Sequence, residues 1–345
     1  METMRAVVVF SAGEVRIAED VPKPVPGEYE ALIRVHACGI CSGTDFQIIN
    51  GTLENGFGGY PTVLGHEGAG EVIAVGRRVR HIRVGERFIH PNLHPDVGGG
   101  YTKTHGSMAQ FGLVCDRQAM CEDGFPEEAI PFPKQHRFPE SISYVDAGVL
   151  LSLAECYSAA KNFGVAAGME ILIYGAGPMG VALALFCRLC GAKSVVQVDR
   201  IPGRLEQARR IAGVDGTVLS GDPASEQLLK DRKFDLVIDA VGLSAILYEG
   251  SSRLKPGGKV GSLGVLKKDD CMIDTSRLQG NTSLHMLNFP SGEYDAMDEV
   301  IAMIECGKLH PTDFYSHVLP YTQLDEALAL VRSREALKVI LTFDE

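Results

Sequence analysis

A glycine-rich turn between an apolar strand and a helix is the feature that most restricts how this chain can fold. Gly175, Gly177 and Gly180 form a G-x-G-x-x-G pattern that follows an apolar run and opens a helix expected over residues 178–190. Pro178 suits the first position of that helix, where the N–H that proline lacks would have no partner. The glycines permit a tight turn, and the N–H groups at the helix start can bind a pyrophosphate. The pattern predicts a dinucleotide-binding unit.

Strands and helices alternate around this turn. Strands are expected at residues 171–174, 194–198, 236–240 and 260–263, and helices at 147–160, 178–190 and 203–212. This alternation is typical of a parallel sheet with crossover helices. Helices at 293–306 and 324–332 and a strand at 337–343 are expected to complete the chain.

The first part of the chain shows a different pattern. Short apolar strands are expected at residues 5–10, 31–37, 72–75 and 86–89, separated by proline and glycine. They predict a β-rich domain. Residues 90–125 have little periodicity and are expected to form one long, functional loop. At 345 residues the chain is long enough for two domains with separate cores.

An acidic residue supports the nucleotide site. Asp199 ends the strand after the glycine turn, about 20 residues past Gly180, where a ribose-binding acid is expected. Its carboxylate would accept hydrogen bonds from both ribose hydroxyls and repel a 2′-phosphate, so NAD is favoured over NADP. Arg200 follows directly, and NADP remains the alternative cofactor because a guanidinium can bind a 2′-phosphate. Met179 completes the set of residues expected to contact the cofactor.

A second group of reactive side chains lies near the N-terminus. Cys38 and Cys41 are followed by Asp45, and then by His66 and Glu67. Thiolate, imidazole and carboxylate are groups that zinc accepts, so this region is a candidate metal site. Because no second Cys-x-x-Cys follows on a plausible loop, a closed four-cysteine site cannot be completed, and an open, catalytic site is favoured.

Composition narrows the class of partner. Lys and Arg total 33 against 44 Asp and Glu, a net charge of -11 without a basic run, so nucleic acids and membranes are poor partners. A small molecule is the favoured ligand. The apolar run at residues 6–10 is too short for a signal or membrane segment, which predicts a cytoplasmic protein. Nine scattered cysteines indicate reduced thiols.

Together these motifs resemble the zinc-containing medium-chain dehydrogenases, the group of alcohol, polyol and threonine dehydrogenases. The resemblance rests on residues 38–45, 65–67, 84–87, 175–180, 254–258 and 338–341. It implies an α/β chain, with a GroES-like β-rich catalytic domain at residues 1–151 and 290–345 and a Rossmann domain of doubly wound parallel sheet at 152–289. It also implies a homodimer or homotetramer.

The resemblance implies a role for each residue near the metal. Cys41, His66 and Glu67 are implied as ligands of one catalytic zinc ion, without a structural zinc, whereas Cys38 is implied not to bind it. Asp45 resembles the acid that holds the zinc-bound histidine, a role with physical support because a ligating ring needs its other N–H held.

Three further residues follow from the same comparison of motifs. Thr44 resembles the hydroxyl that relays the alcohol proton. Ser42 is an extra residue in the run, so the relay residue is either Thr44 or Ser42. Lys338 matches a basic position that approaches the cofactor phosphates.

Glu155 is the single charge in residues 147–160. The ligand that the family usually supplies before this helix falls near Leu150 and Leu151, which cannot bind a metal. A carboxylate on such a helix is costly to bury unless it is paired or metal-bound, which makes Glu155 a candidate to bind the metal or to contact the substrate. Exposure to water, or a pair with a cation, is the alternative.

The predicted function is the reversible, NAD-dependent oxidation of a secondary alcohol, of the polyol, sugar or cyclitol type, to a ketone. The polyol preference comes from the resemblance. One alternative is a zinc-independent enone or quinone reductase on the same fold. The other is an NAD-binding sensor or structural protein without turnover. His90, His94 and His105 share the expected loop, where they either face substrate hydroxyls or are exposed.

Overall fold

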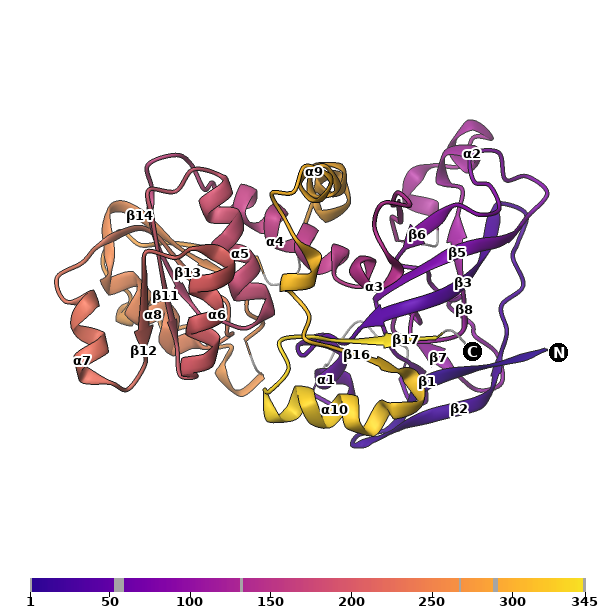
Figure 1. The fold of residues 1–345 in the computed structure, drawn as a ribbon, viewed down its shortest axis with the longest axis horizontal. Coiled ribbons are helices and arrows are strands. Elements are labelled where there is room, and N and C mark those ends of the chain that lie inside the picture. Colours follow the sequence, from indigo (N-terminus) through magenta and orange to yellow (C-terminus); the bar gives the residue numbers. More distant parts are fainter. Residues whose placement is uncertain (1, 53–58, 131–132, 267, 288–290, 344–345) are drawn as a thin grey trace. The chain divides into compact units, whose positions relative to one another are not determined.

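The computed structural model describes residues 2–52, 59–130, 133–266, 268–287 and 291–343 (Figure 1). They form two compact units, Met1–Leu151 with Met297–Glu345, and Ser152–Ala296. The expected return of the chain to the first domain, at residue 290, lies outside the described residues. None of the helices in the described ranges is long and apolar enough to cross a membrane.

The second unit contains a six-stranded sheet in the order β12-β11-β10-β13-β14-β15, with every neighbouring pair parallel. Its strands are β10 (Glu170–Tyr174), β11 (Ser194–Asp199), β12 (Gly216–Leu219), β13 (Phe234–Asp239), β14 (Leu254–Ser262) and β15 (Ser283–Met286). Its helices include α5 (Pro178–Leu189), α6 (Pro202–Ala212), α7 (Pro223–Glu226) and α8 (Ser244–Ser252). Ile171, Leu172 and Ile173 are fully buried, because strands covered on both faces are apolar throughout.

The first unit is rich in β-structure, as its short apolar runs predict. One sheet has the order β2-β1-β4-β7, and another runs β16-β17-β3-β5-β6-β9, with β8 also paired to β3. The strands are β1 (Thr3–Ser11), β2 (Glu14–Pro22), β3 (Glu30–Gly39), β4 (Thr62–Val63), β5 (Glu67–Val75), β6 (Arg87–Ile89), β7 (Thr102–Lys103), β8 (Phe111–Cys115), β9 (His136–Arg137), β16 (His317–Pro320) and β17 (Val339–Thr342). Because β17 pairs with β3, residues from both ends of the chain share one sheet.

Helices complete both units. The first unit carries α1 (Thr44–Ile49), α2 (Arg117–Glu122), α3 (Tyr144–Ala147) and α10 (Leu324–Ser333), whereas α4 (Leu150–Asn162) and α9 (Glu293–Glu305) each begin in one unit and end in the other. A buried core of the first unit joins Ile33 and Val35 of β3 with Ile48 of α1 and Leu341 of β17. This core fixes the end of β3, from which the candidate metal ligands follow.

The expectation of one long loop over residues 90–125 is wrong at three places, the first of which is β7, paired parallel with β4. Residues 111–115 form β8, paired antiparallel with β3, and residues 117–122 form α2. Gly112 is typical of a turn, but here a Cβ would lie 2.9 Å from Cβ of Pro91, so close packing explains the glycine. The Asp116 side chain caps α2 by accepting the N–H of Ala119 at 3.0 Å.

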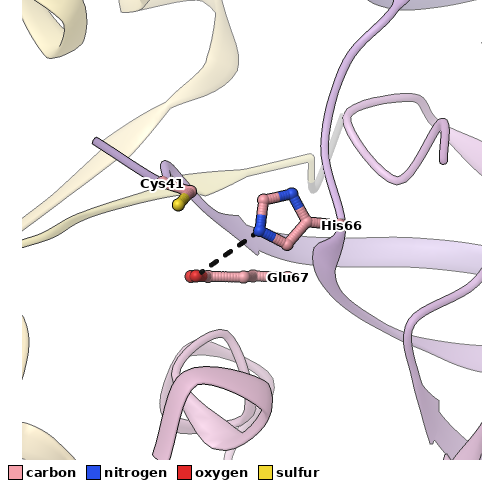
Figure 2. Close-up of side chains that lie close together, drawn as sticks. All are labelled: Cys41, His66 and Glu67. Atoms are coloured by element: carbon pink, nitrogen blue, oxygen red, sulfur yellow. Dashed lines mark ion pairs between the residues drawn. The ribbon is translucent and has the colours of Figure 1, made fainter. Parts of the chain in front are cut away.

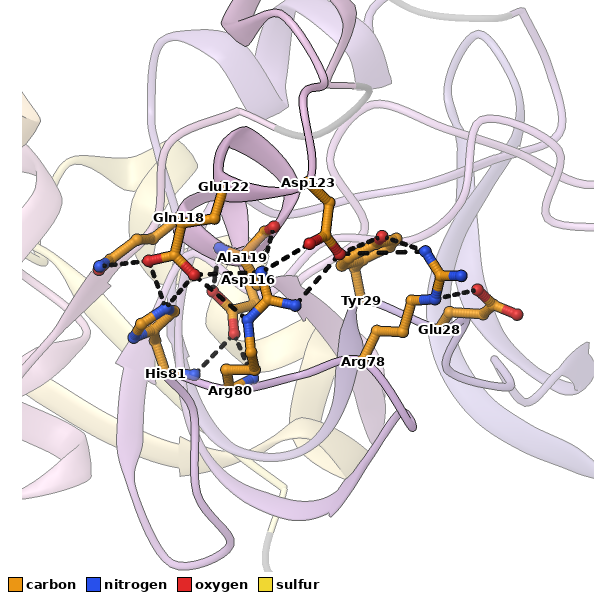
Figure 3. A network of polar contacts seen from close by, with 10 residues as sticks. All are labelled: Glu28, Tyr29, Arg78, Arg80, His81, Asp116, Gln118, Ala119, Glu122 and Asp123. Atoms are coloured by element: carbon orange, nitrogen blue, oxygen red, sulfur yellow. Dashed lines mark hydrogen bonds and ion pairs between the residues drawn. The ribbon is translucent and has the colours of Figure 1, made fainter.

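A network of polar contacts joins α2 to the turn between β5 and β6 (Figure 3). We call it the α2 network, and its members are Glu28, Tyr29, Arg78, Arg80, His81, Asp116, Gln118, Ala119, Glu122 and Asp123. Asp116 Oδ2 accepts the backbone N–H groups of Arg80 and His81, both at 2.7 Å. The Arg80 guanidinium donates to Glu122 at 3.1 Å and to Asp123 at 3.1 Å. The network holds α2 on the first unit.

Candidate metal centre and nucleotide site

The glycine turn has the geometry that its pattern predicts. Gly175 has a φ of +102°, and a Cβ on Gly180 would lie 2.1 Å from the carbonyl oxygen of Gly175. The backbone of the turn therefore requires glycine at both positions, whether or not a ligand is bound. A Cβ on Gly177 would meet nothing closer than Arg204 Nη1, at 3.7 Å, so this position leaves room for a ligand against the backbone. Pro178 is the first residue of α5, as expected.

Asp199 is fixed beside this turn. Its Oδ2 accepts the N–H of Ala176 at 2.7 Å and its Oδ1 accepts the N–H of Ile201 at 2.9 Å. Arg200 is exposed. Met179 packs against α4, where its carbonyl oxygen lies 3.4 Å from Cys156 Sγ. The roles of these residues toward a nucleotide stay predictions.

Cys41, His66 and Glu67 converge in the first unit (Figure 2). Each offers one possible ligand atom, and the three atoms lie within 4.8 Å of one another. Cys41 follows the end of β3 and Glu67 begins β5, whose pairing places Glu67 opposite Gly39. His66 Nε2 lies 3.9 Å from Glu67 Oε1. Within the described ranges, this is the single such group of metal-binding side chains.

Asp45 holds two of these residues in place. Its carboxylate is buried on α1, and Oδ2 accepts the backbone N–H of Cys41 at 2.8 Å. Oδ1 lies 3.5 Å from His66 Nδ1, so the opposite ring nitrogen faces Glu67. Burial alone disfavours a charged imidazole, but Asp45 and Cys41 outweigh it and raise the pKa of His66 well above its usual range.

The donor set fits a zinc ion. A thiol, an imidazole nitrogen and a carboxylate oxygen are zinc ligands, and three of them leave one position for a substrate. Neither Asp45 Oδ1 nor His66 Nδ1 has a hydrogen bond within the described part of the chain, although both are buried. When His66 binds a cation, the Nδ1–H group of its ring can therefore form a hydrogen bond to Asp45 Oδ1.

Glu67 has a buried partner that no sequence motif indicates. Lys338 Nζ, just before β17, pairs with Glu67 Oε2, and the two side chains are 5% and 2% exposed. Oε1 remains on the side of His66. A Cβ on Gly39 would lie 2.4 Å from Oε2, so the carboxylate packs directly against the β3 backbone. A contact of Lys338 with cofactor phosphates stays a prediction.

The remaining residues of the metal run differ in burial. Cys38 is fully buried, and burial raises the pKa of its thiol well above the usual range, which keeps it neutral. Ser42 is exposed and Thr44, the first residue of α1, is half-buried. Neither hydroxyl makes a hydrogen bond to a residue that the structure describes. Their part in a proton relay stays a prediction.

Glu155 lies on α4, within the second unit, and is half-buried. Tyr294 belongs to the same unit, and its pKa is raised by burial first and then by the charges of Glu293 and Glu155. Glu155 therefore lies near another acid and a half-buried phenol. Its role as a metal ligand stays a prediction.

Two histidines of the expected loop contact His66. His90 is buried with a φ of 59°, and its Nδ1 donates to the carbonyl oxygen of His66 at 2.6 Å. The His105 ring lies 5.8 Å from the His66 ring and 4.9 Å from the His90 ring, between centroids. Burial lowers the pKa of His90 to about 4, so that ring is neutral. His94 instead pairs with Glu30 at 2.8 Å.

Comparisons with known proteins agree with this arrangement. Residues 27–137 match the alcohol dehydrogenase GroES-like domain, and residues 178–305 match the zinc-binding dehydrogenase domain. The chain belongs to the zinc-containing medium-chain dehydrogenase family. This confirms the expected family and fold, a GroES-like domain with a Rossmann domain, and makes the chain an oxidoreductase.

Individual relatives of this medium-chain dehydrogenase span nearly its whole length. Sorbitol dehydrogenase of Bombyx mori is 27% identical and covers 97% of both chains. The structure of alcohol dehydrogenase TADH from Thermus sp. ATN1 has a TM-score of 0.80 at 25% identity, covering 99% of this chain and 100% of that one. An alcohol dehydrogenase from Escherichia coli CFT073, solved with NADH, has a TM-score of 0.79 at 23% identity over 99% and 100%.

Proposed function

We propose that this medium-chain dehydrogenase reversibly oxidises a secondary alcohol of the polyol, sugar or cyclitol type to a ketone, with NAD as the hydride acceptor. The observation that carries the proposal is the convergence of Cys41, His66 and Glu67 on one point, as three protein ligands of a single zinc ion. The sorbitol dehydrogenase of Bombyx mori supports a polyol-like substrate.

The reaction balances as a hydride transfer and a proton release. The carbinol carbon loses a hydride to NAD and the hydroxyl group loses a proton, which gives a ketone, NADH and H⁺. Zinc would supply the Lewis acidity that makes this hydroxyl easier to deprotonate. Ser42 follows Cys41 directly and Thr44 lies three residues after it, and one of the two hydroxyls would pass the proton to water.

Two charged residues keep the ligands in position. Asp45 holds the backbone of Cys41 and faces Nδ1 of His66, which fixes the side of the ring that is free to bind. Lys338 neutralises Glu67 through Oε2 and leaves Oε1 for the ligand group. With these contacts the ligands are set before a metal arrives.

For the cofactor, NAD is favoured over NADP. Asp199 stands at the end of β11 beside the glycine turn, where its carboxylate would accept hydrogen bonds from ribose hydroxyls and repel a 2′-phosphate. Arg200 is exposed next to it. The ratio of kcat/KM for NAD to that for NADP measures whether Asp199 or Arg200 determines the cofactor preference.

The proposal is tested with purified protein, metal analysis and a panel of polyols, cyclitols and simple alcohols. We expect one zinc per chain, and NAD reduction that a chelator lowers at least about 100-fold and that added zinc restores. Cys41→Ser should lose both zinc and turnover. Cys121→Ser is the matched control, because this exposed thiol of the same unit should change neither.

Two outcomes would replace the proposal. Reduction of enones or quinones without zinc, unaffected by Cys41→Ser, would identify a zinc-independent reductase. Tight NADH binding without turnover of any alcohol in the panel would identify a sensor or structural protein.

A further inference from the structure

Asn92 has a buried amide group whose donor side lacks an acceptor. It is fully buried, and its Oδ1 accepts hydrogen bonds from the backbone N–H of Leu93, at 3.1 Å, and from Lys103 Nζ. Because both partners can only donate, the amide is oriented with Nδ2 turned away from them. Nδ2 is buried as well, and no residue in the described ranges accepts a hydrogen bond from it. Such a donor calls for an acceptor from a ligand or water.

Lys103 is a half-buried cation beside this amide. Asn92 is its partner, and no carboxylate of the described part of the chain forms an ion pair with it. Burial lowers the pKa of Lys103 to about 8, so the amine is mostly charged at neutral pH. An ammonium group has three N–H bonds, and one faces Asn92. Two donors remain next to a buried amide N–H, and an anion would offset the uncompensated charge.

The pair adjoins the candidate metal centre through His105. The backbone N–H of Leu93 is shared between Asn92 Oδ1 and the carbonyl oxygen of His105, which it reaches at 3.0 Å. This contact places the segment after Asn92 beside the segment after Lys103. The His105 ring in turn lies beside the His66 ring. Burial lowers the pKa of His105 well below its usual range, and the nearby charges of His66 and Lys103 lower it further. Neither ring nitrogen of His105 hydrogen-bonds to a described residue.

We infer that Lys103 and Asn92 bind a carboxylate group of the alcohol substrate, and that His105 binds a hydroxyl group between this carboxylate and the reacting carbon. The substrate class is then a sugar acid, an aldonate, and not a neutral polyol. A carboxylate can accept hydrogen bonds from the Lys103 ammonium and the Asn92 amide, and its single negative charge balances the single positive charge of Lys103. A phosphate monoester carries a charge of about −1.5 to −2 and would leave negative charge uncompensated. This inference rests on the proposed function, because it assigns the substrate of the same site.

The test compares aldonates, the alditols of the same configuration and the alditol phosphates as substrates. D-Gluconate, D-glucitol and D-glucitol 6-phosphate form one such set, to be repeated for the other configurations. We expect kcat/KM to favour the best aldonate over its alditol by about tenfold to 100-fold, as a charge-assisted hydrogen bond supplies. K103M should remove most of this preference by raising KM for the aldonate, whereas K103R should retain part of it.

Two further variants separate a binding role from general damage. N92D keeps the size of the side chain but gives Lys103 an internal carboxylate, so the aldonate preference should fall as it does in K103M. Lys308→Met removes an exposed lysine of the same unit and should leave the preference unchanged. Aldonate binding is also measured without NAD, as the rise in Tm on adding D-gluconate, which K103M should abolish.

Equal turnover of aldonates and alditols, or a preference that K103M leaves intact, would overturn the inference while the proposed function stands. A stronger preference for the alditol phosphate would overturn the choice of carboxylate. If no alcohol is oxidised, the proposed function fails, and the Tm measurement alone then decides whether Lys103 binds a carboxylate.

Discussion

The first unit contains two dense groups of charge that differ mainly in burial. The pair of Glu67 and Lys338 is 2% and 5% exposed, whereas Arg80, Glu122 and Asp123 of the α2 network are 39%, 44% and 31% exposed. Water screens exposed pairs, so each contributes little, but an ion pair in a dry site leaves an expensive charge behind when one partner is lost. Loss of one charged partner therefore costs more free energy of unfolding in the pair of Glu67 and Lys338 than in the exposed part of the α2 network.

The two groups also differ in redundancy. In the buried group each oxygen of Glu67 has its own neighbour, with Lys338 at Oε2 and His66 at Oε1. In the α2 network the guanidinium of Arg80 reaches two carboxylates and the carbonyl oxygen of Ala119. Loss of one contact there leaves the others. The buried group can thus fix the position of the metal ligand Glu67, whereas the exposed network only holds α2 in place.

The largest effect is expected from Lys338→Met. It leaves the Glu67 carboxylate buried without its partner, and we expect a loss of about 3–5 kcal/mol in the free energy of unfolding of the zinc-free protein. Urea unfolding followed by circular dichroism measures it, since the chain has no tryptophan for fluorescence. The double variant Glu67→Gln with Lys338→Met should recover most of the loss, because no charge is then stranded.

Zinc supplies a second check on this pair. A bound cation would replace the charge of Lys338, so the cost of Lys338→Met should shrink when zinc is added. An equal cost with and without zinc would mean that Glu67 does not face the metal.

The contrast between these groups also separates what the sequence predicts from what it does not. Cys41, His66 and Glu67 could be predicted because each lies in a short motif of ligand residues, and β3–β5 pairing then brings them together. Lys338 could not be predicted as the partner of Glu67, because 271 residues separate them and only the pairing of β17 with β3 joins their segments.

The fold divides in the same way. The parallel sheet and the glycine turn were predictable because their signals are local: a strand, three glycines at fixed spacing and Pro178 at the start of α5. Strand β8 was not, since Gly112 interrupts its apolar run and its identity depends on pairing with β3. The contact of His105 with His66 has the same origin, in the packing of segments distant along the chain.

The next largest effect is expected from Gly39→Ala, which acts on the buried group through space instead of charge. The new Cβ would lie 2.4 Å from Glu67 Oε2 and 2.5 Å from the carbonyl oxygen of Gly148, so the carboxylate must shift. We expect a loss of about 1–3 kcal/mol in the free energy of unfolding, together with weaker zinc binding. Gly203→Ala is the control, because its Cβ meets nothing within 4 Å. Unchanged zinc affinity in Gly39→Ala would show that the position of Glu67 does not matter for the metal.

Asp116→Ala tests the buried part of the α2 network. Its carboxylate is 3% exposed and accepts three backbone N–H groups, from Arg80, His81 and Ala119. We expect a loss of about 1–2 kcal/mol in the free energy of unfolding, because the helix cap is lost and the turn loses its anchor. Zinc content and NAD reduction should remain at the level of the unmodified protein. A change in zinc content would mean that the two groups are coupled.

The smallest effect is expected from Arg80→Met, in the exposed part of the same network. The remaining contacts of Asp116 still hold the turn, and water already screens the lost ion pairs, so Tm should fall by less than about 2 °C. Thermal unfolding at low salt and at about 1 M NaCl tests the cause, because screening should erase the difference between Arg80→Met and the unmodified protein. Lys338→Met, compared under the same conditions, should keep its deficit, since ions in solution do not reach a pair that is 5% and 2% exposed. If salt erased both deficits, burial would not be what distinguishes the two groups.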